Sequence, residues 1–314
     1  MKYRLVIFVA VVVAAVAVLS TLHRSTSSSS SHSPAHDTLP STVASYLGVY
    51  EIGPPHRYKP VAGFTKVIGR QPNLVGYYSG WNERFWSSFA QTVSGHGAVT
   101  IVQWDPTDVN VASIARGKYD AYLSSFADGV RAFGGPVVIG FGHEMNATWY
   151  SWGYSHVRPR MFVAAWRHIV TLFRAQGANN VTWLWTINAD LPSTGPLASW
   201  WPGAAYVTWV GIDGYFYRSG DTFASVFGRT IAQVRAFTHK PVLLSETAVG
   251  PEASQAAKIA NLFAGMRRYQ TLGLVWFDIA QSDGLYHQDW RIEDSLAAEA
   301  AFRRGASTLK LTRF

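Results

Sequence analysis

A buried strand and a group of polar and aromatic side chains meet in the segment Val137-Val138-Ile139-Gly140-Phe141-Gly142-His143-Glu144-Met145-Asn146-Ala147-Thr148-Trp149-Tyr150-Ser151-Trp152. The segment begins as an apolar, β-branched run, which is typical of a strand buried on both faces. His143, Glu144 and Asn146 follow this run, and a cluster of aromatic residues comes next. The pattern predicts a core strand that ends in functional side chains.

A second short strand ends in the same way. The segment Pro241-Val242-Leu243-Leu244-Ser245-Glu246-Thr247 is apolar up to the point where it delivers one carboxylate, that of Glu246. Because Glu144 and Glu246 lie far apart in the sequence, only a fold that gathers the ends of different strands could make them partners.

Short apolar runs alternate with amphipathic stretches from about residue 45 to the end of the chain. The amphipathic stretches, such as 160–175, 222–237 and 254–269, carry apolar residues at helical spacing. Eight strand and helix repeats predict a single (β/α)8 TIM barrel rather than an open doubly wound sheet, and no glycine-rich phosphate loop follows the first strand. The predicted strands are residues 46–50, 74–78, 98–104, 137–142, 181–187, 207–212, 242–245 and 274–279.

The barrel prediction also places the site, because active sites of this fold lie at the carboxyl ends of the strands. Glu144 ends the fourth predicted strand and Glu246 the seventh. We therefore expect both glutamates on one rim. The other polar and aromatic residues expected there are Trp81, Trp104, Asp105, His143, Asn146, Asn188, Asp213, Tyr215, Trp276 and Asp278.

The N-terminal residues 1–24 have the pattern of an export element. Lys2 and Arg4 precede an uncharged apolar run from Leu5 to Leu19. Small residues at Ala15-Val16-Ala17 resemble a cleavage site, whereas the run as a whole approaches the lower length limit for spanning a bilayer. We interpret the segment as a signal peptide or a membrane anchor, with cleavage or slow release favoured.

Residues 25–44 are rich in serine and contain almost nothing that could be buried, so we expect a flexible linker. Residues 45–314 then form the catalytic domain. Either interpretation of the N-terminal segment puts this domain outside the cytoplasm, secreted or anchored to the outer face of the membrane. We expect a monomer that contacts a membrane only through the N-terminal segment if that segment is not cleaved.

Composition excludes several other classes of protein. The chain has 314 residues, is 48% hydrophobic and contains 13 tryptophans, which excludes disorder for most of it. It has no cysteine and therefore no disulfide or thiolate metal site. The net charge is +8, but the cations are scattered along the sequence, so we expect a solvated surface and no nucleic-acid partner. They include Arg158, Arg160, Arg167, Arg174, Arg303, Arg304, Lys310 and Arg313.

Two carboxylates on facing strands, among tryptophans and tyrosines, are the minimum apparatus for cleaving a glycosidic bond. One carboxyl group keeps a proton for the leaving oxygen and the other attacks the anomeric carbon. Mutual repulsion separates their pKa values and so their roles. Aromatic rings supply flat apolar faces for the sugar rings. Such a reaction needs no cofactor, and His143 has no second histidine at a metal-ligand spacing on the same element.

Three motifs resemble those of glycoside hydrolase family 26, the β-mannanase family of clan A. The first is His143-Glu144-Met145-Asn146 with Trp149-Tyr150 and Trp152, which is similar to the family signature His-Glu-Met-Asn-Gly-x-Trp-Tyr-x-Trp. The second is Ser245-Glu246-Thr247, and the third runs from Trp201-Pro202-Gly203 to Tyr215. The likeness extends in order from about residue 45 onwards.

The resemblance implies a retaining barrel in which Glu144 is the general acid/base and Glu246 is the nucleophile. It implies that His143 contacts the sugar in the reacting subsite and that Tyr215 donates a hydrogen bond to Glu246. Trp149 and Trp276 would form sugar platforms.

Two positions depart from the family pattern. Ala147 stands where the family has glycine, and Ala204-Ala205 replace its paired aspartates. The second departure touches no catalytic position.

The expected function is therefore a retaining endo-β-glycosidase, a mannan endo-1,4-β-mannosidase-like hydrolase. The family also contains mixed-linkage β-glucanases and β-1,3-xylanases, and these stay as alternatives on the same scaffold. A protein that has kept the barrel but only binds carbohydrate or the cell wall is a further alternative, although such a protein needs neither glutamate. The sequence leaves the sugar, the linkage and the number of subsites open.

Overall fold

The computed structural model describes residues 39–189, 196–281 and 288–314 of the chain, all within one compact unit, His36–Phe314. Eight parallel strands form a closed barrel in sequence order, and β1 pairs with β8 to complete it. The predicted TIM barrel is thus confirmed. The strands are β1 (Tyr46–Tyr50), β2 (Leu74–Gly80), β3 (Val99–Asp105), β4 (Val137–Phe141), β5 (Val181–Asn188), β6 (Trp209–Asp213), β7 (Val242–Thr247) and β8 (Gly273–Phe277).

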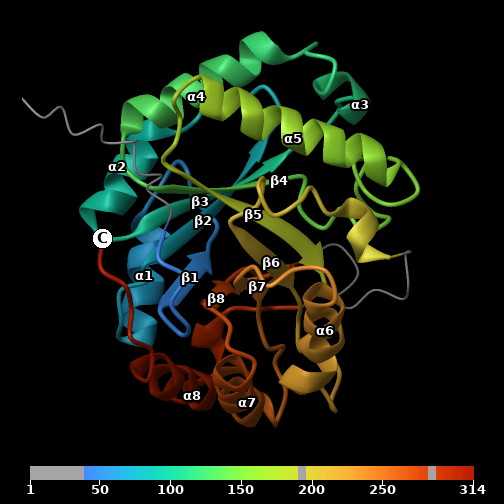
Figure 1. The fold of residues 1–314 in the computed structure, drawn as a ribbon. Coiled ribbons are helices and arrows are strands. Elements are labelled where there is room, and N and C mark those ends of the chain that lie inside the picture. The colour runs from blue at the N-terminus through green and yellow to red at the C-terminus, as the bar shows by residue number, and fades with distance from the viewer. Residues whose placement is uncertain (1–38, 190–195, 282–287) are drawn as a thin grey trace, which may run out of the picture. The chain divides into compact units, whose positions relative to one another are not determined.

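Helices surround the barrel and cover the outer face of its strands (Figure 1). The helix predicted at 222–237 begins as a π-helical turn, Ala224–Gly228, which continues into α6. Short 3-10 turns occur at Leu197–Trp200 and Ile292–Asp294. The α-helices are α1 (Lys59–Ile68), α2 (Ser87–Gly95), α3 (Val111–Ile114), α4 (Asp120–Phe133), α5 (Pro159–Ala175), α6 (Arg229–Arg235), α7 (Gln255–Arg268) and α8 (Leu296–Ser307).

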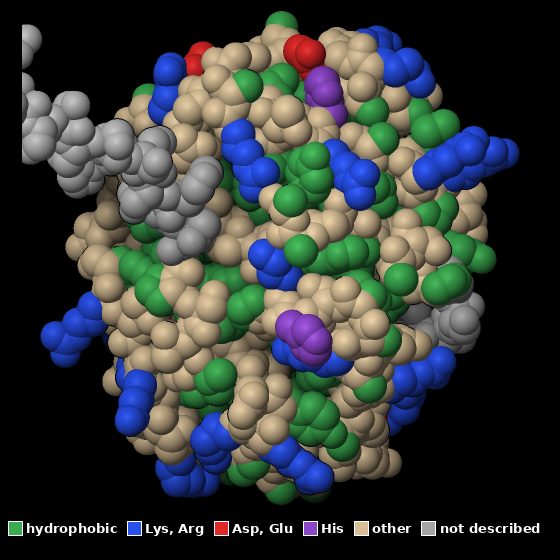
Figure 2. Space-filling model, viewed as in Figure 1, with side chains coloured by type: hydrophobic (Ala, Val, Ile, Leu, Met, Phe, Trp, Pro, Cys, Tyr) green, Lys and Arg blue, Asp and Glu red, His purple; other side chains and the backbone are tan. Residues whose placement is uncertain are grey.

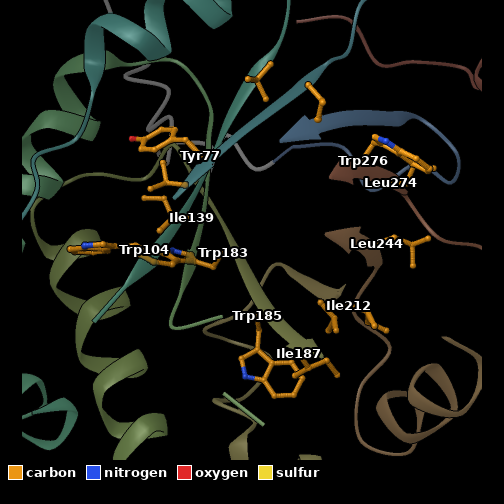
Figure 3. Close-up of a cluster of buried hydrophobic side chains, with 14 of the residues drawn as sticks. Tyr77, Trp104, Ile139, Trp183, Trp185, Ile187, Ile212, Leu244, Leu274 and Trp276 are labelled. Carbon is orange, nitrogen blue, oxygen red and sulfur yellow. The ribbon is translucent and has the colours of Figure 1, made fainter. Parts of the chain in front are cut away.

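Alternation along each strand divides the core into two layers, one inside the barrel and one between the strands and the helices. Two tryptophans of β5, Trp183 and Trp185, are labelled in Figure 3 and belong to the outer layer. Trp183 packs against Phe173, and Trp185 packs against Trp201. Leu184 lies between them and belongs to the interior layer. Neither tryptophan therefore fills the interior of the barrel.

A layer of polar side chains fills the barrel close to its carboxyl end. Gln103 on β3 donates a hydrogen bond to the hydroxyl of Thr186 on β5. Glycines on the intervening strands make room for this layer: a Cβ at Gly140 would lie 2.1 Å from the Gln103 amide oxygen, and one at Gly211 would lie 2.5 Å from Ser245 Oγ. These contacts require glycine at both positions.

The residues before β1 close the other end of the barrel. The backbone N–H of Leu39 donates to Thr182 Oγ1, Tyr46 donates to the Pro40 carbonyl, and Trp209 Nε1 donates to Ser41 Oγ. Leu39 is buried. The prediction that the linker extends to residue 44 is therefore wrong at its C-terminal end, since residues 39–44 pack on the domain.

The predicted segment 1–24 lies outside the described residues. Among the residues that the structure does describe, no helix has both the length and the apolar character needed to cross a bilayer.

Candidate active site

A cavity of about 630 Å³ opens at the carboxyl ends of the strands. It contains both glutamates that the sequence singled out, together with aromatic and amide side chains from most of the strands. Its lining residues are Tyr78, Asp105, His143, Glu144, Trp149, Tyr150, Asn188, Tyr215, Glu246, Phe277 and Gln281.

Glu144 is presented by a tight turn directly after β4. Gly142 and Glu144 have φ values of 55° and 52°, in the left-handed region that residues other than glycine rarely adopt. Hydrogen bonds from Gly142 N to the Trp104 carbonyl and from Glu144 N to the Thr186 carbonyl fix the turn. A left-handed glutamate costs about 1–3 kcal/mol, and such strain is concentrated at functional sites.

Two nitrogen donors hold the Glu144 carboxylate. Asn188 Nδ2 donates to Oε1 at 2.7 Å and Trp149 Nε1 donates to Oε2 at 2.9 Å. Asn146 braces this arrangement, because its side chain exchanges two hydrogen bonds of 2.9 Å with the backbone of Asn188. Glu144 thus has a fixed orientation with both oxygens turned toward donors.

Two phenolic hydroxyls hold the Glu246 carboxylate. Tyr78 donates to Oε1 at 2.6 Å and Tyr215 donates to Oε2 at 2.8 Å. Glu246 belongs to β7, Tyr78 to β2, and Tyr215 follows β6. The hydrogen bond expected from Tyr215 is therefore present, and Tyr78 adds a second one that the motifs did not indicate.

The two glutamates face each other. One oxygen of Glu144, one of Glu246 and one of Asp213 all lie within 4.8 Å of each other, and all three residues are buried. Asp213 accepts a 2.5 Å hydrogen bond from Ser245 at Oδ1, while Oδ2 has no partner among the described residues. Burial, together with the charges of Glu246 and Glu144, raises the pKa of Asp213 well above its ordinary value and so favours the neutral form of this carboxyl.

Burial controls the ionisation of the pair as well. It raises the pKa of Glu246 to about 7, although His143 and the hydroxyls of Tyr78 and Tyr215 favour the charged form. Burial also raises the pKa of Glu144, against the stabilising effect of His143, Asn188 and Trp149. The charge on one glutamate opposes ionisation of the other. Near neutral pH the pair therefore favours a state with one proton.

The imidazole of His143 lies beside the pair and is held at both ring nitrogens. Its Nδ1 lies 2.7 Å from Asp105 Oδ1, and its Nε2 lies 3.0 Å from the Tyr150 hydroxyl. Burial lowers the His143 pKa, but Asp105, with help from Glu246 and Glu144, outweighs burial and raises it to about 9. His143 lines the cavity, and a pKa of about 9 favours its imidazolium form near neutral pH.

The two tryptophans expected to be sugar platforms differ in their exposure to the cavity. Trp149 lines the cavity and is 43% exposed, so one face can receive a ring. The prediction for Trp276 is wrong: the side chain is fully buried, packs against Phe302 of α8 and donates to the Trp290 carbonyl. Its neighbour Phe277 has the opposite parity on β8 and reaches the cavity instead.

Sequence reasoning missed several lining residues. Tyr78 was the last residue of the predicted strand 74–78. That position at the carboxyl end of a strand was the one sign that it could line the site. Phe277 and Gln281 gave no signal. Trp81 and Trp104, which were expected on the rim, and Trp152 of the first motif are buried and do not line the cavity.

Among the described residues, Glu144, Asp213 and Glu246 form the cluster that is close enough to hold a metal ion. The hydrogen bonds around this cluster argue for protons rather than a metal. Both oxygens of each glutamate already accept from an N–H or O–H donor, and Asp213 accepts from Ser245. We assign no ion to it.

Comparison with known proteins decides the family. The family model described as glycosyl hydrolase family 26 matches residues 86–304. The chain belongs to this family. Endoglucanase H of Acetivibrio thermocellus is 31% identical to this chain over 260 residues. The aligned region covers 77% of this chain and 28% of Endoglucanase H. The mannan endo-1,4-beta-mannosidase of Bacillus subtilis is 26% identical over 221 residues, or 63% of this chain and 58% of that protein.

A beta-1,3-xylanase, TXYA of a Vibrio species, is 26% identical over 151 residues, which cover 48% of this chain and 31% of that protein. This chain thus spans between about a quarter and three fifths of the length of these relatives.

Solved structures share the fold of this chain. A GH26 beta-mannanase from Bacteroides ovatus superposes with a TM-score of 0.62 at 17% identity, covering 86% of this chain and 90% of that one. The Bacillus subtilis mannanase man26 superposes with a TM-score of 0.61 at 19% identity, covering 83% of this chain and 84% of that one.

Proposed function

We propose that this chain is a retaining endo-β-glycosidase that hydrolyses a β-linked polysaccharide by a two-glutamate double displacement. The observation that carries the proposal is the approach of the Glu144 and Glu246 carboxylate oxygens to within 4.8 Å. Retaining glycosidases hold their carboxyl groups about 5–5.5 Å apart, whereas inverting enzymes need about 6.5–9.5 Å to admit a water molecule.

The reaction has two steps. In the first, Glu144 gives its proton to the glycosidic oxygen while a Glu246 oxygen attacks the anomeric carbon, so that the glycosidic bond breaks and an ester to Glu246 forms. In the second, Glu144 takes a proton from water, the water oxygen bonds to the anomeric carbon, and the ester breaks. The configuration of the sugar is inverted twice and so is retained.

The hydrogen bonds favour this division of roles. Tyr78 and Tyr215 give Glu246 two short O–H donors, which stabilise a carboxylate better than the amide and indole N–H donors of Glu144 do. The first step requires the shared proton on Glu144 and the negative charge on Glu246, and these donors favour that arrangement of the pair. The positive charge of His143 adds to the stabilisation of the ionised nucleophile.

Trp149 and Phe277 suit the sugar itself, because both present aromatic surface to the cavity next to the glutamates. Gln281 and Asn188 offer amide groups that can bind sugar hydroxyls there. A cavity that is aromatic on its walls and polar at its base matches a pyranoside, whose ring has apolar C–H faces and a polar edge.

For the backbone sugar we propose β-1,4-mannan, in line with the motifs and with the mannosidase among the relatives. A mixed-linkage β-glucan is the second candidate, since the relative named Endoglucanase H has a higher identity than that mannosidase. A β-1,3-xylan is the third, from the xylanase relative.

Reducing-sugar release from galactomannan, lichenan and β-1,3-xylan separates these candidates. We expect kcat/KM on galactomannan to exceed that on the other two by at least about tenfold, because a site built for one ring stereochemistry loses paired hydrogen bonds with another. A preference for lichenan would assign the chain to mixed-linkage glucan. Binding without release on all three would support the carbohydrate-binding alternative.

The tyrosine beside the nucleophile should set the acidic limb of the pH profile. The Tyr215 hydrogen bond stabilises ionised Glu246 and lowers its pKa, so Tyr215→Phe raises the Glu246 pKa above about 7. Ionised nucleophile then forms only at higher pH, and we expect the acidic limb of kcat/KM to move up by about one pH unit. Tyr154→Phe, at a half-exposed tyrosine that does not line the cavity, is the matched control. An unmoved limb in Tyr215→Phe would contradict the assignment.

We also propose that the domain works outside the cytoplasm, secreted or held at the outer face of the membrane, because a polysaccharide substrate lies there and the N-terminal segment has the pattern of an export element. Fractionation of cells that express the full chain tests this proposal, and activity confined to the cytoplasm would contradict it.

A further inference from the structure

The end of the barrel opposite the cavity is basic. We call this end the basal face: it consists of the last turns of the helices, the loops that follow them and the C-terminal tail. Although the cations are scattered along the sequence, every helix of a (β/α)8 barrel ends on the same side, so the fold gathers them. Lys and Arg side chains are spread over this face and Asp and Glu side chains are sparse (Figure 2). The basal cations are Lys66, Arg70, Arg131, Arg174, Arg235, Lys240, Arg267, Arg268, Arg303, Arg304, Lys310 and Arg313.

Acidic residues follow the opposite distribution. Among the described residues, Asp128 of α4 is the acidic residue close to the basal face, and it pairs with Arg131 at 2.8 Å. The other described acidic residues lie at the carboxyl end of a strand, in the loop after it or in the first turn of the next helix. The domain is therefore strongly polarised, with its positive end away from the cavity.

Helix capping explains part of this pattern but not its net charge. Cations at helix C-termini are favourable for the helix dipole, and Arg174 and Arg235 donate to the carbonyls of Ala205 and Lys240. A carbonyl partner leaves the positive charge uncompensated. Five further basal cations are exposed and make no side-chain hydrogen bond or ion pair with the described part of the chain: Lys66, Arg268, Arg304, Lys310 and Arg313.

The chain enters the domain through this same face. Leu39, Pro40 and Ser41 are bound at the amino ends of β5, β1 and β6, so the first described residues lie at the basal end. The preceding sequence contains the apolar run Leu5–Leu19. Leu39 lies twenty residues after Leu19, and a chain of this length can reach at most about 70 Å, so a bilayer that holds the run must lie within that reach of Leu39.

We propose that the basal face docks on an anionic lipid surface while the apolar N-terminal segment is held in the same membrane. Lys and Arg are attracted to anionic headgroups within about a Debye length, and the tether makes this contact intramolecular. Docking in this orientation leaves the cavity open on the side away from the membrane, where a polymer can reach it. The point at which the chain enters favours lipid over a soluble anionic polymer, because a polymer would have no relation to the position of the tether.

The absence of cysteine allows a direct test in the full-length chain. A cysteine at Gly95, at the basal end of α2, and one at Gly220, in a loop at the cavity end, each enter open space. Each single-cysteine protein carries a donor dye and is reconstituted in vesicles that contain a headgroup acceptor, either of pure phosphatidylcholine or with one part in four phosphatidylglycerol. We expect energy transfer from the Gly95 dye to be about twofold higher on the anionic vesicles, to fall to the neutral-vesicle level in 0.5 M NaCl, and to show no such rise at Gly220.

Charge variants identify the surface. Replacing the five free basal cations Lys66, Arg268, Arg304, Lys310 and Arg313 with glutamine should remove the rise at Gly95. The matched control makes the same change in net charge at the cavity end, and the rise in energy transfer from the Gly95 dye should persist in it. It replaces the exposed cations Arg57, Lys59, Arg158, Arg160 and Arg229 with glutamine. Equal transfer on both kinds of vesicle, or an equal loss in both variants, would overturn the proposal. Tighter binding to soluble polygalacturonate than to the anionic vesicles would also overturn it, in favour of an anionic polymer.

Discussion

Glu246→Ala should abolish hydrolysis of the polysaccharide, with a loss in kcat of at least about 10⁴-fold, comparable to losses in other enzymes that lose a covalent nucleophile. The substitution removes the atom that attacks the anomeric carbon, and no other described carboxylate in the cavity can take its place, since Glu144 is held by Asn188 and Trp149 in a different position. Reducing-sugar release, with circular dichroism as a check on folding, measures the effect.

The fold should survive this change, because the removed group is a buried carboxyl whose ionisation is opposed by burial and by Glu144. Glu299→Ala, which removes a carboxylate that pairs with Arg303 and does not line the cavity, is the matched control and should keep full activity. Azide, an anion small enough to occupy the space left by the carboxylate, should restore turnover of an activated aryl glycoside and give a glycosyl azide of inverted configuration. Full activity of Glu246→Ala without azide would end the proposal.

The sequence predicted the barrel and its two glutamates because both depend on local patterns. A buried parallel strand is an uninterrupted apolar run, and the first polar residue after it marks the carboxyl end of the strand. Glu144 and Glu246 could be placed on one rim by counting strands, without any knowledge of contacts between them. The prediction depended on element order alone, which the closed barrel preserves.

The misplaced tryptophan shows where such counting fails. Trp276 and Phe277 are adjacent aromatic residues on β8, and only the register of the strand decides which one faces the cavity. That register shifts between Leu244 and Thr247 of the neighbouring β7, an irregularity that no apolar pattern signals. One partner of Glu246 was hidden for a similar reason: Tyr78 comes from β2, and only the closed barrel brings it to the carboxylate that the motifs had already paired with Tyr215.

Charge was the property that sequence reasoning described least well. The cations are dispersed along the chain, which indicated a uniformly solvated surface. In the barrel, however, a residue at the end of any helix belongs to one face, so a periodic arrangement in the sequence becomes a continuous surface in the fold. The same geometry puts the acidic residues, which follow strands, around the cavity. The polarity of the domain is thus a consequence of the βα repeat.

Glu144→Gln should separate the two steps of the reaction. Loss of the general acid slows cleavage of a poor leaving group by about 10²–10⁴-fold, so we expect kcat/KM on the polysaccharide to fall by that amount. An aryl glycoside with a dinitrophenolate leaving group needs no proton, so its first step should stay fast while the ester to Glu246 accumulates, because no base activates water. A burst of dinitrophenolate followed by slow turnover is the expected signature. An equal loss on both substrates would contradict a role in proton transfer.

Glu144→Gln should also shift the pH profile, because it removes the charge of Glu144 from beside Glu246. Ionised Glu144 opposes ionisation of Glu246 and so contributes to its pKa of about 7, whereas a neutral glutamine carries no charge. In Glu144→Gln the Glu246 pKa should therefore fall, and the acidic limb of kcat/KM for the dinitrophenyl glycoside should move to lower pH. Tyr215→Phe moves this limb to higher pH, so the two variants displace one ionisation in opposite directions. Only a carboxylate that contacts both residues can respond in this way, which makes the pair of profiles a test of Glu246 as the attacking group.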